Sequence, residues 1–523
     1  MVRAIHYRFY RSNTVREQPL SLPFDPTGIV LDRRLGLSRQ LYQVLRARVL
    51  DGRLGSGTRL PASRDLAKAL ALSRNSVVRA YDQLYAEGFI ESRVGDGTYV
   101  AQLPKLSTNI STGLSRGFST ALSTKSPEST EHLTSKVIHT GSLSRLEKHH
   151  LPAPKSGPPR AFRVGAPAFD LFPFETWAKL QAGFWRKPDP ALLGYGDPAG
   201  EPILRELIAT YLRRSRGLSC SAEQIVITSG AQQAISLCAQ LLLEPGDGVA
   251  VENPGYRAAG HAFALAGARV FGVAVDNEGM DCAALSALPQ CRLSYVTPSH
   301  QYPTGVTMSL ARRLELLAWA ERSDGWIVED DYDGEYRYSG APLAPLAALD
   351  PHGRVLYVGT FGKIAFPALR MGYLVVPPPL VEAFSRCRAL AVRHSEIGNQ
   401  VVMAQFMAQG HFQRHIRRMR RAALSRRNVL KAGWPVDIPG CGAMPEVAAG
   451  LHVKVDVDNL ARERELIARA EAVGVELNPL SDYWLEDSST PVDKRAGLVL
   501  GFAAVPEAAI ADALARLRRA WRR

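Results

Sequence analysis

The feature that most constrains this chain is a segment that cannot build a hydrophobic core. Residues 103–160 contain 18 serines and threonines, few aromatic residues and a proline-rich end. Such a segment buries too little apolar surface to offset its conformational entropy, which predicts a flexible linker. We therefore expect four parts in the 523 residues: an N-terminal extension at 1–30, a compact module at 31–102, the linker, and a large domain at 161–523.

Charge and cysteine usage limit the classes of function. The chain has 64 Lys and Arg against 50 Asp and Glu, and this net charge of +14 suits a polyanion or a phosphate-bearing ligand. Its six cysteines are scattered singly, which predicts reduced core residues and neither a disulfide framework nor a metal site. No signal peptide and no run of about 18 apolar residues is found. We expect a cytoplasmic, nucleoid-associated protein without a membrane anchor.

The module at 31–102 has the pattern of a winged helix-turn-helix. Leu41, Leu45 and Val49 recur at helical spacing and predict a first helix with one apolar face. Ser63 is placed to cap a second helix and Ser73 a third, with the tight turn LALS between them. Two strand-like runs around a Gly-Asp-Gly turn follow, in FIESRVGDGTYV, and predict a hairpin wing.

The third helix is the candidate for contact with base edges. Val77 and Tyr81 face inward, which leaves the N-terminal part of this helix exposed for the major groove. Arginine and asparagine can form bidentate contacts with guanine and adenine. A solvated basic face on a small helical domain is the alternative. The candidates for base contact are Arg74, Asn75, Ser76 and Arg79, and those for phosphate contact are Arg64, Lys68 and Arg93.

The run from LPASRDLAKAL to VGDGTYV resembles the GntR-type winged helix over essentially the whole module. The resemblance implies that Arg64, Arg74 and Asn75 touch double-stranded DNA and that Gly95 lies at the wing tip. The sequence departs from the family at Val78, where many members carry another arginine next to the position of Arg79.

The large domain alternates helical patterns with short apolar runs, such as QIVITSG, WIVEDDY and VLYVGT, which predicts an α/β fold with a largely parallel sheet. In WIVEDDYDGEY, the period of two places Asp330 and Tyr332 on one face and Asp331 on the other. A carboxylate can keep a pyridine nitrogen protonated, and a phenol can bond a ring oxygen. A pair of acids ending a strand in solvent is the alternative.

Two further segments predict an aldehyde cofactor with a phosphate. Lys363 follows a strand within a Thr/Gly turn and can bond covalently with an aldehyde, although such a lysine alone is usually a solvated residue. The run ITSGAQQAISL ends a strand and starts a helix, so that its free N–H groups face an anion. The candidates for holding the phosphate are Ser229, Gly230, Ala231, Thr360 and Arg370.

The motifs LGYGDPAG, TSGAQQAI, ENPGY, PSHQYPTG, EDDYDGEY and GTFGK together resemble the fold-type I pyridoxal-phosphate aminotransferases over nearly all of 161–523. Joined to a GntR-type winged helix, they resemble the MocR-type transcriptional regulators. This resemblance implies a mainly parallel sheet, a smaller C-terminal α/β subdomain, the cofactor pyridoxal 5'-phosphate and a homodimer.

The resemblance also assigns roles to single residues. Lys363 would bind the cofactor covalently, Asp330 would pair with its ring nitrogen, Tyr332 would bond the 3-oxygen and Tyr256 would stack on the ring. Tyr195 would reach the phosphate bound in the neighbouring subunit. The phosphate itself would be held by Ser229, Gly230, Ala231, Thr360 and Arg370.

Departures from the aminotransferase pattern favour sensing over catalysis. Gly362 stands where a serine usually precedes the lysine, and Val499 stands where aminotransferases place an arginine for the substrate carboxylate. Without that arginine the carboxylate loses its charge-assisted bidentate anchor. We expect a DNA-binding regulator that senses an amino compound or pyridoxal phosphate itself. The alternative is an active aminotransferase with an accessory DNA-binding module, which would retain at least a slow half-reaction.

The basic run HIRRMRRAALSRRNVL at 415–430 allows two interpretations. It could be a second DNA-binding helix, but Ile416, Met419 and Ala423 fall on one side. We therefore expect an amphipathic helix that leads into the small subdomain.

Overall fold

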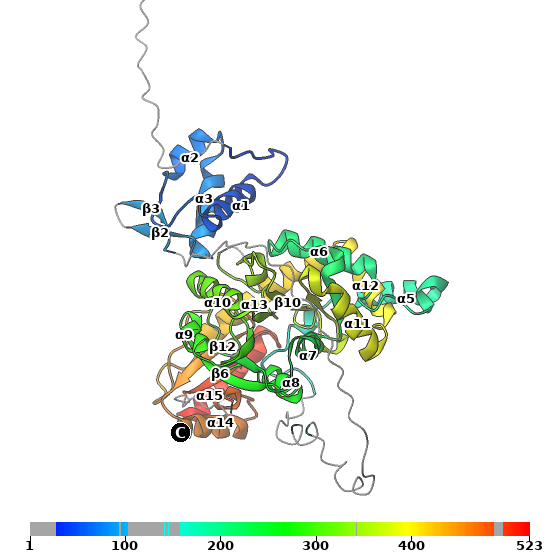
Figure 1. Ribbon diagram of the computed structural model, residues 1–523. Helices are drawn as coiled ribbons and strands as arrows, with labels where there is room; N and C mark the ends of the chain where they lie inside the picture. The colour runs from blue at the N-terminus through cyan, green and yellow to red at the C-terminus, as the bar shows by residue number, and fades with distance from the viewer. Residues whose placement is uncertain are drawn as a thin grey trace, which may run out of the picture. The chain divides into compact units, whose positions relative to one another are not determined.

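A computed structural model describes residues 28–93, 96–102, 141, 145, 157–340, 343–485 and 495–522 (Figure 1). The chain splits into two compact units, Met1–Gln102 and Leu103–Arg523. The predicted N-terminal extension and linker lie almost wholly outside the described residues and stay predictions. Among the described residues, no helix has both the length and the apolar character needed to cross a membrane.

The N-terminal unit is a three-helix module with a small antiparallel sheet of order β1-β3-β2. Its core is made by one apolar face from each helix, including the fully buried Leu41, Leu66, Val77 and Leu84. The helices are α1 (Leu37–Leu50), α2 (Ser63–Ala69) and α3 (Arg74–Ala86). The strands are β1 (Arg59–Leu60), β2 (Ile90–Arg93) and β3 (Gly97–Val100), so the predicted hairpin wing is confirmed.

One of the two predicted helix caps is confirmed and the other is wrong. The Ser73 hydroxyl accepts a hydrogen bond from the Ser76 N–H at 3.1 Å, as predicted for a helix start. Ser63 is instead the first helical residue of α2, and Ala62 occupies the capping position without a side-chain hydrogen bond. The extended residue before the helix comes one position earlier than predicted, so the Ser63 hydroxyl is not in the capping position.

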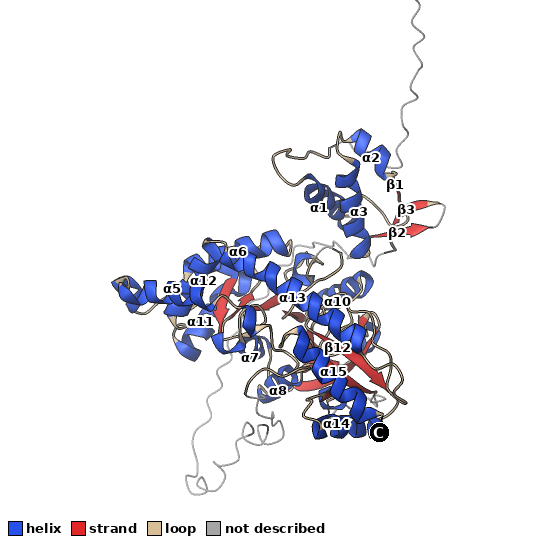
Figure 2. Cartoon of the chain, turned by 180° about the vertical axis from the view of Figure 1, so that it is seen from behind, coloured by secondary structure: helices blue, strands red, loops and turns tan. Residues whose placement is uncertain are grey.

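The large unit is built on an eight-stranded sheet of order β4-β11-β10-β9-β8-β5-β6-β7 (Figure 2). The pairs β10–β9, β9–β8, β8–β5 and β5–β6 are parallel, whereas β11 runs antiparallel to both β10 and β4, and β7 to β6. This mainly parallel sheet confirms the predicted fold class. The strands are β4 (Ile225–Thr228), β5 (Gly248–Asn253), β6 (Arg269–Asp276), β7 (Gly279–Met280), β8 (Cys291–Val296), β9 (Trp326–Asp331), β10 (Val355–Thr360) and β11 (Gly372–Val375).

Helices cover both faces of this sheet, which explains why its strands are continuous apolar runs. On β4, Ile225 and Ile227 belong to one hydrophobic cluster and Val226 to another, so successive side chains enter two separate cores. The helices of this layer are α5 (Phe174–Arg186), α6 (Pro202–Ser215), α7 (Ala231–Leu242), α8 (Arg257–Leu265), α9 (Cys282–Ser286), α10 (Leu310–Ser323), α11 (Val381–Val392) and α12 (Ile397–Ala408).

A C-terminal subdomain, orange and red in Figure 1, has its own antiparallel sheet of order β12-β14-β13. The long helix α13 (His411–Gly433) leads into it and buries Ile416, Met419 and Ala423, which confirms the predicted amphipathic helix. The other elements are β12 (His452–Val457), α14 (Leu460–Ala472), β13 (Asn478–Pro479), β14 (Ala496–Gly501) and α15 (Glu507–Trp521).

Candidate functional site

A cavity of about 190 Å³ lies where several strands of the large sheet end. Asp330 is at the carboxyl end of β9, Thr360 at that of β10, and Gly230 follows β4. In open α/β sheets, ligands bind at this edge. Eight of the predicted cofactor residues line the cavity: Gly230, Ala231, Tyr256, Asp330, Tyr332, Thr360, Lys363 and Arg370.

Asp330 has one carboxylate oxygen that is ready for a cationic partner. Its Oδ2 accepts a hydrogen bond from the Tyr295 hydroxyl at 2.8 Å, whereas its buried Oδ1 has no hydrogen-bond partner among the described residues. Burial is the main cause that raises the pKa of Asp330 to about 7. A protonated ring nitrogen in the cavity would give Oδ1 the donor that it lacks, so this residue fits pyridoxal phosphate.

Asp331 confirms the predicted alternation of side chains along β9. It faces away from the cavity, forms a buried ion pair with Arg216, and accepts a hydrogen bond from the Tyr357 hydroxyl at 2.6 Å. Asp330 is therefore the carboxylate of this strand that serves the cavity, and Asp331 is structural.

Lys363 brings an amine into the same cavity. Its Nζ donates to the Gly165 carbonyl oxygen at 2.8 Å. Burial lowers the pKa of Lys363, and the carboxylates of Asp333 and Asp330 act in the opposite direction. Gly165 has a φ of +81°, and a Cβ added there would lie 2.9 Å from the Nζ. Glycine at 165 thus leaves room for the amine, whose lowered pKa favours the neutral, nucleophilic form.

One wall of the cavity is suited to an anion. Gly230, with a φ of 91°, precedes the first turn of α7, whose free N–H groups and dipole favour negative charge. The Arg370 guanidinium is held there by a hydrogen bond from Nη2 to the Ser229 carbonyl oxygen at 2.7 Å. The Thr360 hydroxyl lies on the same wall and accepts from the Gly362 N–H at 3.1 Å. This donor set fits a phosphate group.

Two tyrosines, Tyr256 and Tyr332, also line the cavity. The Tyr256 hydroxyl donates to Gln232 Oε1 at 3.1 Å, and burial raises its pKa to about 12. The Tyr332 hydroxyl donates to the His300 carbonyl oxygen at 2.8 Å. Burial raises the pKa of Tyr332 well above its usual range, so both phenols keep their protons at neutral pH.

Two predicted residues differ from the others in position. Ser229 contributes its backbone carbonyl to Arg370 and is not among the residues that line the cavity. Tyr195 is 91% exposed and lies outside the cavity, with its ring 5.9 Å from the ring of His394. Its predicted contact with a neighbouring subunit stays a prediction.

A buried network beside Tyr332 was not predicted from the sequence. His300 Nδ1 lies 3.0 Å from Asp333 Oδ2 and 3.1 Å from the Tyr332 hydroxyl, and the Leu451 N–H donates to the same Asp333 oxygen at 3.2 Å. His452 completes the cluster. One ring nitrogen of His300, one of His452 and a carboxylate oxygen of Asp333 all lie within 4.8 Å of one another. The motifs PSHQYPTG and EDDYDGEY contained His300 and Asp333, but no local pattern indicated that His452 packs against them.

The predicted DNA-contacting residues lie on one exposed part of α2 and α3. Arg64, Arg74, Asn75 and Arg79 are exposed, and Ser76 is half-buried beside the Ser73 cap. Within the described part of the chain, none of these arginines forms an ion pair. Gly95 lies outside the described residues. On the wing, Arg93 packs 4.3 Å from the ring centre of Tyr99 and pairs with Glu91 at 2.9 Å.

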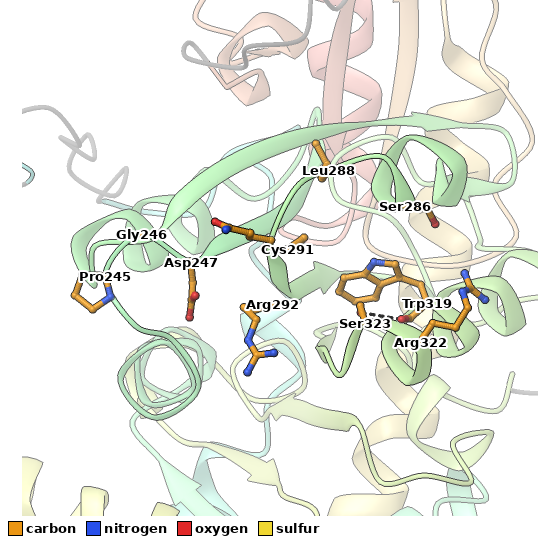
Figure 3. A pocket seen from close by; sticks show the side chains of 11 residues that line it. Pro245, Gly246, Asp247, Ser286, Leu288, Cys291, Arg292, Trp319, Arg322 and Ser323 are labelled. Atoms are coloured by element: carbon orange, nitrogen blue, oxygen red, sulfur yellow. Dashed lines mark hydrogen bonds between the residues drawn. The ribbon is translucent and has the colours of Figure 1, made fainter. Parts of the chain in front are cut away.

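Figure 3 shows a second hollow, of about 790 Å³, whose lining includes Asp247, Arg292 and Trp319. It lies next to the first residues of β5 and β8, Gly248 and Cys291, and so at the opposite edge of the sheet from Lys363. None of the predicted site residues lines it, which leaves the Lys363 cavity as the site for the cofactor.

Fold and cavity together define the class of protein, a pyridoxal-phosphate domain of the aminotransferase type in a chain that also carries a winged helix-turn-helix. The family described as aminotransferase class I and II matches residues 162–444. The bacterial regulatory proteins of the gntR family match residues 37–100.

Relatives with the same arrangement are regulators. The chain is 36% identical to the probable rhizopine catabolism regulatory protein MocR of Rhizobium meliloti, over 94% of this chain and 96% of that protein. It is 31% identical to the HTH-type transcriptional regulator TauR of Rhodobacter capsulatus, over 96% of this chain and 100% of that protein. The chain belongs to the MocR-type family of helix-turn-helix transcriptional regulators with an aminotransferase-like domain.

A solved structure supports the cofactor. The alpha-aminoadipate aminotransferase LysN of Thermus thermophilus, complexed with N-(5'-phosphopyridoxyl)-L-leucine, matches with a TM-score of 0.64 and 26% identity, over 75% of this chain and 98% of that chain. The predicted family, fold class and cofactor, pyridoxal phosphate, are thereby confirmed, and the helix-turn-helix family implies DNA as a partner.

Proposed function

We propose that this regulator senses an amino compound, or pyridoxal phosphate itself, in the cavity of Lys363 and thereby changes how it occupies DNA. One observation carries the proposal: the half-buried amine of Lys363 and a buried carboxylate oxygen of Asp330 without a donor share one cavity with an anion-binding wall. Pyridoxal phosphate, when bound, supplies an aldehyde that can pass from the amine of a lysine to the amine of a ligand.

Each side chain has a separate task in this proposal. Lys363 would offer the neutral amine, and Asp330 would keep a proton on the ring nitrogen. The Tyr332 hydroxyl, which donates to the His300 carbonyl oxygen in this structure, would turn to donate to the 3-oxygen instead. Tyr256 supplies a planar ring for stacking. The phosphate would be held by Gly230, Ala231, Thr360 and Arg370, and Ser229 would position Arg370 through its carbonyl oxygen.

The position of Val499 supports sensing over rapid turnover. Val499 is fully buried in β14, and its carbonyl oxygen accepts a hydrogen bond from Asn478 Nδ2 at 3.1 Å. An apolar side chain here cannot form the bidentate contact with which arginine holds a carboxylate. The Lys363 amine that sensing needs is therefore present, while the geometry for efficient amino-acid transamination lacks one anchor.

A homodimer is part of the proposal. Three large apolar side chains near His394 are exposed: Tyr195 (91%), Leu390 (90%) and Val392 (43%). The ring of Tyr195 lies 5.9 Å from that of His394, and Leu390 and Val392 shortly precede His394 in the sequence. Exposed apolar patches of this kind mark interaction sites. A second copy that covers this patch would bring Tyr195 to the edge of the partner's cavity, as the family resemblance implies.

For DNA, we propose that α3 enters the major groove of an operator. Arg74, Asn75, Ser76 and Arg79 would contact base edges there, Arg64 would contact a phosphate, and Gly95 would let the wing tip approach the backbone. The protein would act in the cytoplasm, on the DNA of the nucleoid.

The substitution Lys363→Ala tests the proposal in the full-length protein loaded with pyridoxal phosphate. We expect the variant to lose the visible absorbance of the covalently held cofactor, because no other amine lines the cavity among the described residues. It should still bind DNA. The matched control is Lys179→Ala, at an exposed lysine outside the cavity, which should keep the absorbance.

A second measurement tests sensing. Candidate primary amines should shift the DNA affinity of the unmodified protein and of the Lys179→Ala control, but not that of Lys363→Ala. Visible absorbance that persists in Lys363→Ala, or an amine response that survives this substitution, would remove Lys363 from the mechanism.

A further inference from the structure

The solvent face of α13 carries a stripe of four exposed arginines, Arg414, Arg417, Arg418 and Arg421. We call it the arginine stripe. At about 100° per residue, these positions fall within an arc of about 100° of the helix surface. The residues that α13 buries, among them Met419 and Ala423, lie on the opposite side.

The arginine stripe has no acidic counterpart. The sequence of α13 contains neither Asp nor Glu, and Arg414 donates instead to the Gln409 carbonyl oxygen at 3.1 Å. In the part of the chain that the structure describes, Arg417, Arg418 and Arg421 form no ion pair.

Some arginines of the same unit are paired within their helix. The exposed Arg386 pairs with Glu382 on α11, and the half-buried Arg469 and Arg516 pair with Glu465 on α14 and Asp512 on α15, each four residues apart. Such pairs stabilise a helix surface. The arginine stripe differs because four exposed like charges lie together on one helix face with no acid on that helix.

Folding gives no reason for this arrangement. Arginines three and four residues apart repel one another, and those near the start of a helix also oppose its dipole. Arg414 is the fourth residue of a 23-residue helix, and Arg421 is the eleventh. This repulsion lowers the stability of α13, and a partner with negative charge would relieve it.

We propose that the arginine stripe binds the phosphate backbone of DNA, as a contact separate from the winged helix. It spans about 10 Å of helix, long enough for two or three phosphates of one strand. Guanidinium groups bind phosphate oxygens bidentately, and such contacts add affinity without selecting a sequence. The inference rests on DNA binding by the winged helix, to which the large unit is covalently linked.

The test uses the full-length protein and a labelled duplex of mixed sequence, about 60 base pairs long, with binding measured by fluorescence anisotropy between about 50 and about 300 mM salt. The stripe variant combines Arg417→Gln, Arg418→Gln and Arg421→Gln. A matched control combines Arg322→Gln, Arg464→Gln and Arg519→Gln, which removes the same charge from exposed arginines on other elements.

We expect the stripe variant to bind about tenfold or more weakly near about 150 mM salt. Its plot of log affinity against log salt should be less steep by about 2 to 3, since each lost phosphate contact removes about 0.9 from the slope. Replacement of the same three residues by lysine should restore most of the affinity, because the charge is retained. The control should keep the slope of the unmodified protein.

Equal slopes and affinities in the stripe variant and the control would overturn the inference, because net charge alone would then account for any loss. A wild-type chain that binds no DNA would overturn the proposed function as well. Helical circular dichroism identical to that of the wild type verifies that the stripe variant is folded.

Discussion

In the cofactor-free protein, the buried carboxylate of Asp330 should lower the free energy of unfolding by an amount that depends on pH. Burial raises the pKa of Asp330 from its ordinary 3.8 to about 7. A rise of this size corresponds to at most about 4 kcal/mol of the free energy of unfolding. Between about pH 4 and pH 7 the folded protein binds this proton and the unfolded chain does not, so stability falls as the pH rises and the loss is complete above about pH 7.

Asp330→Asn removes the ionisation and keeps the shape of the side chain. Its amide oxygen can accept the hydrogen bond from Tyr295, and its amide nitrogen takes the place of the Oδ1 atom that has no donor. At about pH 8 we expect the cofactor-free variant to be more stable than the wild type by about 2 to 4 kcal/mol. At about pH 5 the difference should be less than about 1 kcal/mol, because the carboxyl group is protonated there.

Urea denaturation of both proteins at these two pH values measures this difference. Glu252, Glu329 and Glu335 also have pKa values raised to about 7, but all three are present in both proteins. Their contributions cancel except for the small effect of the Asp330 charge on Glu252, which is the least of the causes that shift its pKa. Added pyridoxal phosphate should reverse the order, because the carboxylate then gains a cationic partner. Equal stabilities at the higher pH, or the same difference at both pH values, would refute this account of Asp330.

Three further substitutions probe other parts of the chain. Ser73→Ala removes the cap of α3 and should lower the stability of the N-terminal unit by about 1 kcal/mol in thermal denaturation, whereas Ser63→Ala should have little effect. Arg216→Met leaves the buried Asp331 without its guanidinium and should cost about 3 to 5 kcal/mol in urea denaturation, with partial recovery in a double variant that also carries Asp331→Asn. Arg74→Ala should weaken binding to the preferred DNA by about 1 to 3 kcal/mol, and an unchanged footprint would argue against a base contact.

Local patterns sufficed for the residues whose role depends on their own element. The period of two in β9 separated Asp330 from Asp331, and the helical spacing in α3 identified Val77 and Tyr81 as buried. The Ser73 cap was found because a capping hydrogen bond spans only three residues. Ser63 shows the limit of this reasoning, because a shift of one position in the helix start changes the role of the side chain.

Contacts between distant segments could not be predicted in this way. The donor to Asp330 is Tyr295, which is 35 residues away, and the acceptor for the Lys363 amine is the carbonyl of Gly165, which is 198 residues away. The first contact depends on strand order, which brings the ends of β8 and β9 together. The second depends on how the segment before α5 is placed, where Phe162 bridges to Gly501. The approach of His452 to His300 depends likewise on how the C-terminal subdomain packs.

The antiparallel strand β11 has a consequence for the order of events during synthesis. It lies between β4 and β10 in the sheet, so the cavity wall that suits a phosphate is complete only after residue 375 has left the ribosome. Strand β14 pairs with β12 later still. The winged helix draws its core from residues 41–100 alone. Because chains are synthesised from the N-terminus at about 5 to 20 residues per second, the DNA-binding unit can fold about 14 seconds or more before the pyridoxal-phosphate site is complete. A half-made chain would therefore be able to occupy DNA before it can respond to any metabolite.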